Sequence, residues 1–444
     1  MARTPTRPHD AATSTSTQPL IDDCFRFDPR DGARLAHADV IARLKERIRP
    51  VVGTTACALD KAHGRVVAKD VAAALPVPGH TNSAVDGYAV AHAGLAADAA
   101  TELIVAGRAT AGHVWDGDTD DGEAIRIFTG AVMPAGCDSV AMQEDCETFD
   151  HDGTAYVRVP PGLKRGANVR CAGEDVQKGA LMLRAGDIVR PQDIAAMASV
   201  GQAKLSCFER LRVAVVSTGD EVLRAGTAKL KVGQVYDTNA PMLASLAGLS
   251  GCAVTDLGIW PDNRADVIGR LAAATESHDV VLTSGGASLG DEDHMAQAIT
   301  ELGTRHFWQI AVKPGRPLMF GQINNTVVVG LPGNPVAVFV CFLMYVQPLL
   351  RRLAGAHWPT PQRFKLPAAF SVRDRKRGRR EFWRATTIQT ETGLAVAKYP
   401  KDGSGLISGL RAADGLIDVH EDLPAVQEGD LLDFIPFTEF GITA

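Results

Sequence analysis

The sequence has few aromatic residues and no excess of positive charge, and both features restrict its possible partners. Phe, Trp and Tyr make up 6% of the 444 residues, whereas glycine occurs 43 times. This composition favours close packing of helices on sheets over a broad aromatic binding surface. The net charge is −6, whereas a reader of nucleic acid needs a basic face. We therefore expect no nucleic-acid partner, although a basic cluster lies at residues 373–380.

The eight cysteines lack the spacing of a metal site or a disulfide framework. No two of them form a C-x-x-C pair, and none lies in a His-rich cluster. Structural zinc sites and small secreted scaffolds both depend on such patterns. The cysteine usage is typical of a reducing compartment, so we predict a cytoplasmic protein.

The sequence also lacks an uninterrupted apolar span and a secretory leader. The apolar run at residues 336–350 is interrupted by Gln347 and Pro348. We expect it to be too short to cross a bilayer and to form a buried helix. Residues 1–19 are rich in Thr, Ser, Pro and Arg without an apolar core. This excludes a secretory signal and predicts a disordered leader, so no membrane partner is expected.

A chain of this length is expected to divide into several domains. Residues 20–205 are predicted to form an N-terminal and linker region. It carries an inserted, mostly β subdomain at about 73–171, where turns rich in Gly and Asp separate short strands. Hydrophobic periodicity and stop signals predict three helices in the wider region. They cover residues 38–49, 57–63 and Pro191–Ser199.

Residues 206–356 alternate short apolar runs with helical patterns. Residues 213–216 and 280–282 are runs of the kind that buried parallel strands require. Helices are expected at Asn239–Leu249 and after Asp262, which can cap the next helix. This alternation predicts a doubly wound α/β domain. Residues 357–444 return to short strands and predict a small β-barrel or sandwich, so the fold class is α/β multidomain.

Three unusual loops follow strands of the α/β region. They occupy residues 217–221, 283–294 and 330–336. The middle loop alone is equally consistent with an ordinary strand-to-helix turn that ends in a helix cap. Taken alone, the first loop is better explained as a turn with a solvated acid, and the third as a turn with Pro at the first helical position. Ligands of open α/β sheets bind outside the carboxyl ends of the strands, however, where the three loops would converge. We therefore predict one binding crevice at this edge.

The middle loop has the composition of a phosphate site. Its glycines allow backbone amides to approach an anion closely, and its serine hydroxyls add donors. Three carboxylates follow at residues 291–293. They would repel a phosphate unless a hard cation lay between them, and Mg²⁺ held by carboxylates and substrate phosphates is the usual solution.

Several separated motifs together resemble a known family. Residues 217–221 (STGDE), 236–239 (YDTN), 283–286 (TSGG) and 331–335 (LPGNP) resemble the MoaB/Mog-like molybdopterin-binding domain of molybdenum-cofactor enzymes. Outside that domain, residues 82–89 (NSAVDGYA), 126–130 (RIFTG) and 173–175 (GED) resemble the molybdopterin molybdenumtransferase family, of the MoeA and gephyrin E-domain type. The resemblance extends over nearly the whole chain after Pro19.

The resemblance implies an elongated homodimer whose active site is shared between the α/β domain of one subunit and the N-terminal region of the other. It implies insertion of molybdate into adenylylated molybdopterin with release of AMP, dependent on Mg²⁺, as the last step of molybdenum-cofactor synthesis. Other cofactor-assembly enzymes and molybdoenzymes would be further partners.

The resemblance also assigns roles to individual residues. The implied catalytic residues are Asp86, Thr129, Glu221, Asp293 and Lys313, and Glu221 and Asp293 would face the metal. The residues implied to hold the pterin phosphate or nucleotide are Ser217, Asp262, Ser284, Gly285, Gly286, Ser288, Pro332, Gly333, Asn334 and Pro335. The implied molybdate residues are Lys313, Arg384 and Ser404.

Simpler interpretations of these residues stay open. Arg384 alone would more often be a surface cation, and Ser404 an ordinary turn residue. Asp86 could be a turn acid and Thr129 the end of a strand. Two departures bear on molybdate affinity: Gln309 stands where members often carry Lys, and His294 replaces an aromatic residue. Two other functions fit the motifs, a molybdopterin adenylyltransferase and a non-catalytic scaffold like gephyrin.

Overall fold

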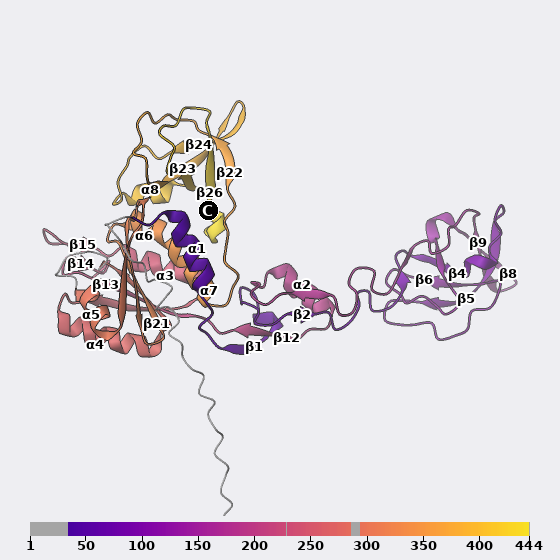
Figure 1. Cartoon of the computed structure of the whole chain (residues 1–444). Helices are drawn as coiled ribbons and strands as arrows, with labels where there is room; N and C mark the ends of the chain where they lie inside the picture. Colours follow the sequence, from indigo (N-terminus) through magenta and orange to yellow (C-terminus); the bar gives the residue numbers. More distant parts are fainter. Residues whose placement is uncertain (1–33, 228, 286–293, 444) are drawn as a thin grey trace, which may run out of the picture.

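The protein is an elongated molecule, described here from a computed structural model that covers residues 34–227, 229–285 and 294–443. Figure 1 shows a large body, a small middle module and a β lobe at the far end. The predicted leader at residues 1–19 lies outside the described residues. The predicted multidomain α/β architecture is confirmed.

A six-stranded sheet forms the centre of the large body, with the order β16-β13-β17-β21-β20-β18. Its first four strands are parallel, and β20 and β18 are antiparallel additions. The strands are β13 (Arg212–Thr218), β16 (Ala253–Trp260), β17 (Val280–Ser284), β18 (Thr304–Gln309), β20 (Pro317–Ile323) and β21 (Thr326–Leu331). Strands β17 and β21 are buried throughout, as near-continuous apolar runs predict.

Helices cover both faces of this sheet. One face packs on α4 (Arg264–Ser277) and α5 (His294–Leu302). The other face packs on α1 (His37–Arg47), α3 (Asn239–Leu249) and a long helix at Pro335–Leu353. Two separate hydrophobic cores result, one on each side of the sheet, and this is the doubly wound arrangement.

The long helix corrects one expectation from the sequence. It comprises α6 (Pro335–Cys341), a π-helical turn at Phe342–Val346 and α7 (Gln347–Leu353), so Gln347 and Pro348 do not interrupt it. Pro348 lies in the first turn of α7, just after the π turn, where a missing N–H costs little. By length and composition the helix could cross a membrane, but 89% of its most apolar window is buried in the protein. The prediction of a buried helix is confirmed.

The C-terminal domain is a second six-stranded sheet. Its path is β19-β23-β25-β26-β22, and β24 pairs with β23. The strands are β19 (Val312–Lys313), β22 (Phe364–Pro367), β23 (Arg380–Thr390), β24 (Gly393–Lys398), β25 (Gly415–Val419) and β26 (Leu431–Pro436). A short helix, α8 (Ile407–Ala412), lies beside β23. Strand β19 precedes β20 in the chain but pairs with β23, which fastens the two domains together.

The middle module combines segments from both sides of the inserted lobe. Here β1 (Thr54–Ala58) pairs with β12 (Lys204–Phe208), and β2 (Val71–Ala72) pairs with β11 (Leu181–Leu183). Helix α2 forms at Pro191–Ser199, as predicted. The helix predicted at residues 57–63 is wrong, because pairing with β12 draws its first residues into β1 and leaves one 3-10 turn, Leu59–Lys61. Distant pairing overrides local propensity here.

The far lobe is a β domain built on one six-stranded sheet, ordered β7-β4-β6-β5-β9-β8. Its strands are β4 (Gly87–Val90), β5 (Thr101–Ala109), β6 (Glu123–Ile127), β7 (Ser139–Met142), β8 (Glu147–His151) and β9 (Thr154–Val159). The pair β3 (Asn82–Ser83) and β10 (Val169–Arg170) lies at the point where the chain enters and leaves the lobe. We call this unit, residues 85–170, the distal lobe.

Candidate functional site

The carboxyl ends of three central strands meet at one edge of the α/β sheet. Ser217 on β13 is in register with Ser284 on β17, and Ser284 is in register with Leu331 on β21. The loops that follow these strands are the three loops that the sequence singles out. Their convergence is therefore observed for the residues that the structure describes.

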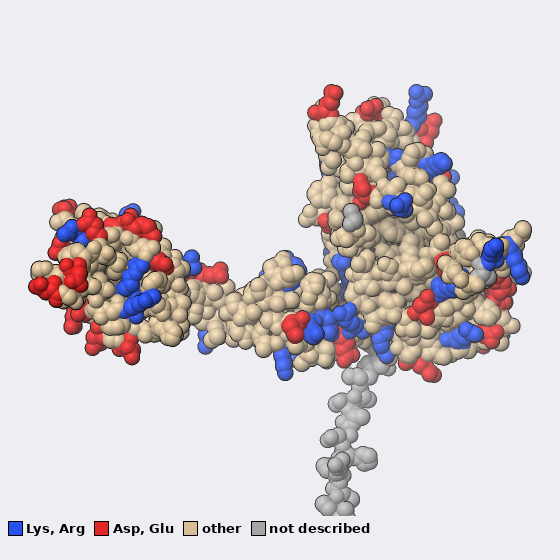
Figure 2. Space-filling view, turned by 180° about the vertical axis from the view of Figure 1, so that it is seen from behind, with Lys and Arg blue, Asp and Glu red and all other residues tan. Residues whose placement is uncertain are grey.

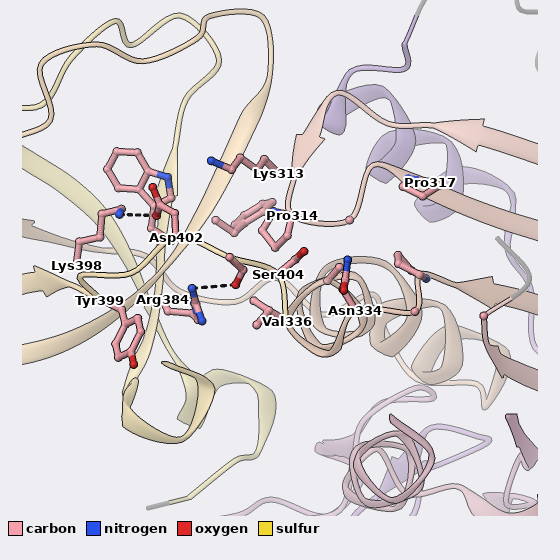
Figure 3. A pocket seen from close by; sticks show the side chains of 18 residues that line it. Lys313, Pro314, Pro317, Asn334, Val336, Arg384, Lys398, Tyr399, Asp402 and Ser404 are labelled. Carbon is pink, nitrogen blue, oxygen red and sulfur yellow. Dashed lines mark hydrogen bonds and ion pairs between the residues drawn. The ribbon is translucent and has the colours of Figure 1, made fainter. Parts of the chain in front are cut away.

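A cavity of about 790 Å³ opens at this edge, between the α/β domain and the C-terminal domain. The α/β side contributes Gly285, Pro332, Gly333 and Asn334, and the C-terminal domain contributes Trp383, Arg384, Lys398, Tyr399, Asp402 and Ser404. The wall is completed by Lys313, the last residue of β19, and by Pro314, which follows it (Figure 3). Sites of this size between domains are common for small ligands.

Two backbone contacts fix the two walls of the cavity relative to each other. The Val336 amide, in the first turn of the long helix, donates to the Ser404 carbonyl at 2.9 Å. On the other side, Lys313 of β19 is in register with Glu381 of β23. Ser404 is thus held against the α/β domain, although 68 residues separate it from Val336, and the predicted molybdate residues Lys313, Arg384 and Ser404 line one cavity.

Arg384 is buried rather than exposed, with 7% of its surface accessible. Its guanidinium donates to the carbonyl oxygens of Leu406 at 2.8 Å and Lys401 at 2.9 Å, and it stacks on Tyr399 with Cζ 5.0 Å from the ring centre. Burial lowers the pKa of this guanidinium, which nevertheless stays charged at neutral pH. Arg384 therefore organises the loop that carries Ser404 and brings a positive charge to the wall.

The positively charged side chains of the cavity differ in how closely a carboxylate pairs with them. The Lys398 ammonium donates to the Asp402 carboxylate at 2.7 Å, and Lys313 Nζ lies 4.0 Å from the Glu381 carboxylate. Partial burial raises the pKa of the Asp402 carboxyl, but the Lys398 hydrogen bond and the nearby positive charges outweigh it, so the pKa lies below its ordinary value. Among the described residues, the hydrogen-bond acceptors of Arg384 are all neutral carbonyl oxygens. The cavity thus keeps positive charge available for an anion.

Asn239, to which the sequence analysis gives no role, ties two of the crevice loops together. It is 7% exposed, and its side-chain amide donates to Ser284 Oγ at 2.7 Å and to the Gly333 carbonyl at 2.7 Å. Its Oδ1 is buried without a hydrogen-bond partner among the described residues. Its place in the YDTN motif was the available signal, but nothing local indicates contacts 45 and 94 residues away.

Ser217 is used within the protein rather than directed at the cavity. Its hydroxyl donates to the buried Asp237 carboxylate at 2.6 Å. The same carboxylate accepts from Arg224 and from the first backbone amides of α3, at Asn239 and Ala240. The geometry therefore gives Ser217 and Asp237 a positioning role, and Asp237 is a second residue that the sequence analysis left without one.

The acidic side of the crevice is exposed. Glu221 and Asp220 lie at the surface after β13, and the Asp262 amide donates to Asp220 Oδ1 at 3.3 Å. Asp262 Oδ1 also lies 3.8 Å from His294 Nε2. The prediction that Asp262 caps the next helix is wrong, because Asn263 accepts from the amides of the first turn of α4. The chain takes one more residue to turn into that helix.

Part of the predicted phosphate and metal site lies outside the described residues. This holds for Gly286, Ser288 and Asp293. Within the described ranges, no three His, Cys, Asp or Glu side chains converge as metal ligands. Gly285 has a φ of +92° and its amide donates to the Leu331 carbonyl at 3.2 Å, so the turn after β17 requires glycine here.

Asp86 and Thr129 come together as a pair in the distal lobe. The Thr129 amide and hydroxyl both donate to Asp86 Oδ1, at 2.8 and 2.7 Å. These two bonds hold the pKa of the Asp86 carboxyl below its ordinary value. Figure 1 places the lobe at the far end of the molecule. Within one chain, therefore, this pair does not reach the cavity.

Three family models match almost the whole chain. They are the MoeA N-terminal region (domain I and II) at residues 35–201, a probable molybdopterin binding domain at 214–352 and the MoeA C-terminal region (domain IV) at 365–437.

Curated relatives and solved structures agree with these models. The molybdopterin molybdenumtransferase of Haemophilus influenzae is 37% identical over 381 residues, which cover 85% of this chain and 93% of that protein. Molybdopterin molybdenumtransferase 2 of Mycobacterium tuberculosis is 32% identical over 406 residues, covering 89% and 97%. The molybdopterin biosynthesis moeA protein of Pyrococcus horikoshii superposes with a TM-score of 0.78 at 27% identity, covering 91% of this chain and 100% of that one.

Proposed function

Because the chain belongs to the MoeA family of molybdopterin molybdenumtransferases, we propose that it is a molybdenum insertase whose substrates are molybdate and adenylylated molybdopterin. The observation that carries the proposal is the cavity between the α/β and C-terminal domains. Its walls combine a Gly-rich strand end with cationic side chains, and both suit anionic substrates.

Molybdate would bind at the C-terminal wall of the cavity. Lys313 and Arg384 supply positive charge there, and the Ser404 hydroxyl supplies a donor. An oxyanion entering a partly buried site must exchange its hydration for such donors. The Lys398–Asp402 pair adds a positive charge whose partner is already in place, so it favours the anion less than Lys313 does.

The phosphate of the pterin substrate would bind at the other wall. The long helix begins at Pro335 beside the cavity, and the positive end of a helix dipole favours phosphate. Gly285 and Gly333 leave the backbone open to close approach, while Asn239 holds both loops in place. The Ser284 oxygen accepts from the Asn239 amide, and Asp262 would lie on the outer side of the bound substrate.

Magnesium would bind at the acidic side of this site. Glu221 is exposed, and no cation pairs with it among the described residues; with Asp293 it would supply hard carboxylate oxygens. Mg²⁺ in phosphate sites usually takes one or two carboxylates and completes its shell with phosphates and water, so a protein cage of three ligands is not required. When bound, the ion would neutralise the phosphate charge that AMP carries away.

We further propose that the active enzyme is a cytoplasmic homodimer with a shared site. Asp86 and Thr129 form a preorganised pair, and the second Asp86 carboxylate oxygen has no hydrogen-bond partner among the described residues. The pair lies far from the cavity of its own chain. A second copy can bring its distal lobe to that cavity. Cofactor-assembly enzymes and molybdoenzymes would be the partners that deliver substrate and receive product.

The decisive experiment measures AMP released from adenylylated molybdopterin. We expect release only when both molybdate and Mg²⁺ are present, and loss of release in Lys313→Ala. Lys365→Ala is the matched control, because Lys365 is exposed and pairs with Asp433 on the C-terminal sheet away from the cavity. AMP release without molybdate would contradict the proposal. An adenylylated product formed from ATP and molybdopterin would indicate an adenylyltransferase, and folded protein without either activity would indicate a scaffold.

A further inference from the structure

Two arginines of the distal lobe lie beside each other without acidic partners. Arg108 on β5 and Arg126 on β6 are in register on adjacent parallel strands, so their side chains share one face of the sheet. Like charges in such positions repel each other. No carboxylate forms an ion pair with either guanidinium within the described part of the chain. The arrangement is unfavourable in isolation and suggests an anion supplied from outside the chain.

Aromatic rings hold the two guanidinium groups in place. Arg108 Cζ lies 4.6 Å and Arg126 Cζ 4.9 Å from the centre of the Phe128 ring, and Arg126 Cζ also lies 4.9 Å from the centre of the Tyr88 ring. Arg126 donates to the Gly87 carbonyl at 3.1 Å and to the amide oxygen of Gln143. These contacts orient the cations without neutralising them, as a preformed anion site requires.

The pair adjoins the residues that the proposed function assigns to the shared site. Asp86 immediately precedes β4, and Thr129 lies two residues after the end of β6. Gly87 of β4 is in register with Ile127 of β6, so the two residues lie at the same end of this strand pair. The positive charge of Arg126 also acts on the Asp86 carboxylate. A ligand that reaches Asp86 and Thr129 therefore passes close to Arg126.

The charge of the surrounding lobe limits the size of that ligand. Residues 85–170 contain 14 Asp and Glu against 6 Lys and Arg, a net charge of −8, and Figure 2 shows acidic side chains over much of this lobe. Arg158, on the same sheet, is already paired with Glu102 and Glu147. An extended polyanion would be repelled by the lobe, whereas a single phosphate or diphosphate group fits two neighbouring arginines.

We propose that Arg108 and Arg126 bind the phosphate or diphosphate group of the substrate that lies in the cavity of a second copy. The proposal rests on the proposed function, because it places these arginines in the shared site. The planar guanidinium forks pair with phosphate oxygens through two parallel hydrogen bonds. Arg108 makes no side-chain hydrogen bond to the described residues of the lobe, so it can turn toward a ligand without breaking one.

The first test compares Arg108→Gln and Arg126→Gln with the control Arg158→Gln. We expect the KM for adenylylated molybdopterin to rise on the order of 10- to 100-fold in the first two, as for loss of a charged hydrogen bond. The KM for molybdate and the sedimentation of the dimer should stay unchanged, and Arg158→Gln should match the wild type. A weaker dimer with an unchanged KM would overturn the proposal and assign the arginines to the contact between copies.

One further measurement separates this proposal from the proposed function. Titration of the full-length protein with ADP, as a diphosphate probe, should give binding that weakens at least tenfold in Arg126→Gln but not in Arg158→Gln. This result does not depend on insertase activity. Equal ADP affinity in all four proteins would overturn the assignment, and Arg108→Gln decides the matter if Arg126→Gln unfolds at a lower temperature.

Mixed dimers test whether the arginines act across subunits. A Lys313→Ala subunit paired with an Arg126→Gln subunit has one cavity in which both defects meet and one that is intact. Activity should therefore return on mixing two variants that are each defective alone. If the arginines serve the cavity of their own chain, every cavity keeps one defect and no activity returns.

Discussion

Replacement of Asn239 by Ala should damage the crevice more than its small change in volume suggests. The side-chain amide of Asn239 is the donor for Ser284 Oγ and for the Gly333 carbonyl, both at 2.7 Å. Ser284 and Asn239 are each 7% exposed, so water replaces these bonds poorly. The change therefore removes the direct link between the loops after β17 and β21.

The magnitude follows from the two acceptors that lose their donor. A buried polar group left without its partner costs roughly 1–3 kcal/mol. Taking values in the lower part of this range for each of the two acceptors, we expect the unfolding free energy to fall by about 2–4 kcal/mol. Asn239→Asp keeps the shape but directs a carboxylate at two oxygen atoms, so it should cost at least as much.

Denaturant unfolding and steady-state kinetics together test this reasoning. Asn263→Ala is the matched control, because Asn263 caps α4 by accepting from the amides of Ala265 and Asp266 and lies outside the cavity lining. It should lose about 1 kcal/mol and keep its KM values, whereas Asn239→Ala should also raise the KM for the pterin substrate. Equal stability losses with unchanged KM in both variants would refute the role of the tie.

Two other predictions concern packing and pH. Gly315→Ala should lower the unfolding free energy by about 2–4 kcal/mol, because φ is +97° and a new Cβ would overlap Cys341 Sγ. In denaturant unfolding, the double variant with Cys341→Ala should recover the part of this loss that comes from the overlap, but not the part that comes from φ. No recovery would contradict the overlap. Burial lowers the pKa of His37 from 6.5 to about 4. As the pH falls, His37 therefore takes up its proton in the unfolded chain before it does so in the folded protein. The unfolding free energy should drop by about 2 kcal/mol between pH 7 and pH 5. His37→Gln should lack this part of the drop, and an unchanged pH dependence in that variant would exclude His37 as its source.

The sequence was most informative where structure depends on local pattern. Buried parallel strands are apolar throughout, so β17 could be recognised, and α2 begins at Pro191 where a proline is favoured at a first helical turn. The three strand-end loops could be placed at one edge because parallel strands end on the same side. The strand-end pattern thus predicted the α/β wall of the cavity, whereas Lys313, Arg384 and Ser404 were expected only from the family resemblance.

The features that escaped prediction depend on contacts between distant segments. Strand β19 has only two residues, and its pairing with β23 in another domain leaves no local trace. Arg384 is buried because a loop of the C-terminal domain folds over it, whereas an isolated arginine on a strand is most simply a surface cation. The same applies to β1, where a helical pattern gives way to pairing with β12.

Helix α1 has a consequence for how the chain folds during synthesis. It is 11 residues long, and an isolated helix of this length is marginal in water. Its stabilising contacts come late, since His37 bonds to Tyr345, 308 positions further along the chain. Leu35, just before the helix, bridges to Ile310. On the ribosome the distal lobe can fold long before α1 finds its partners. An early helix of the chain is therefore among the last to gain its tertiary contacts. During synthesis its apolar face stays exposed for a long time, and chaperones can bind it.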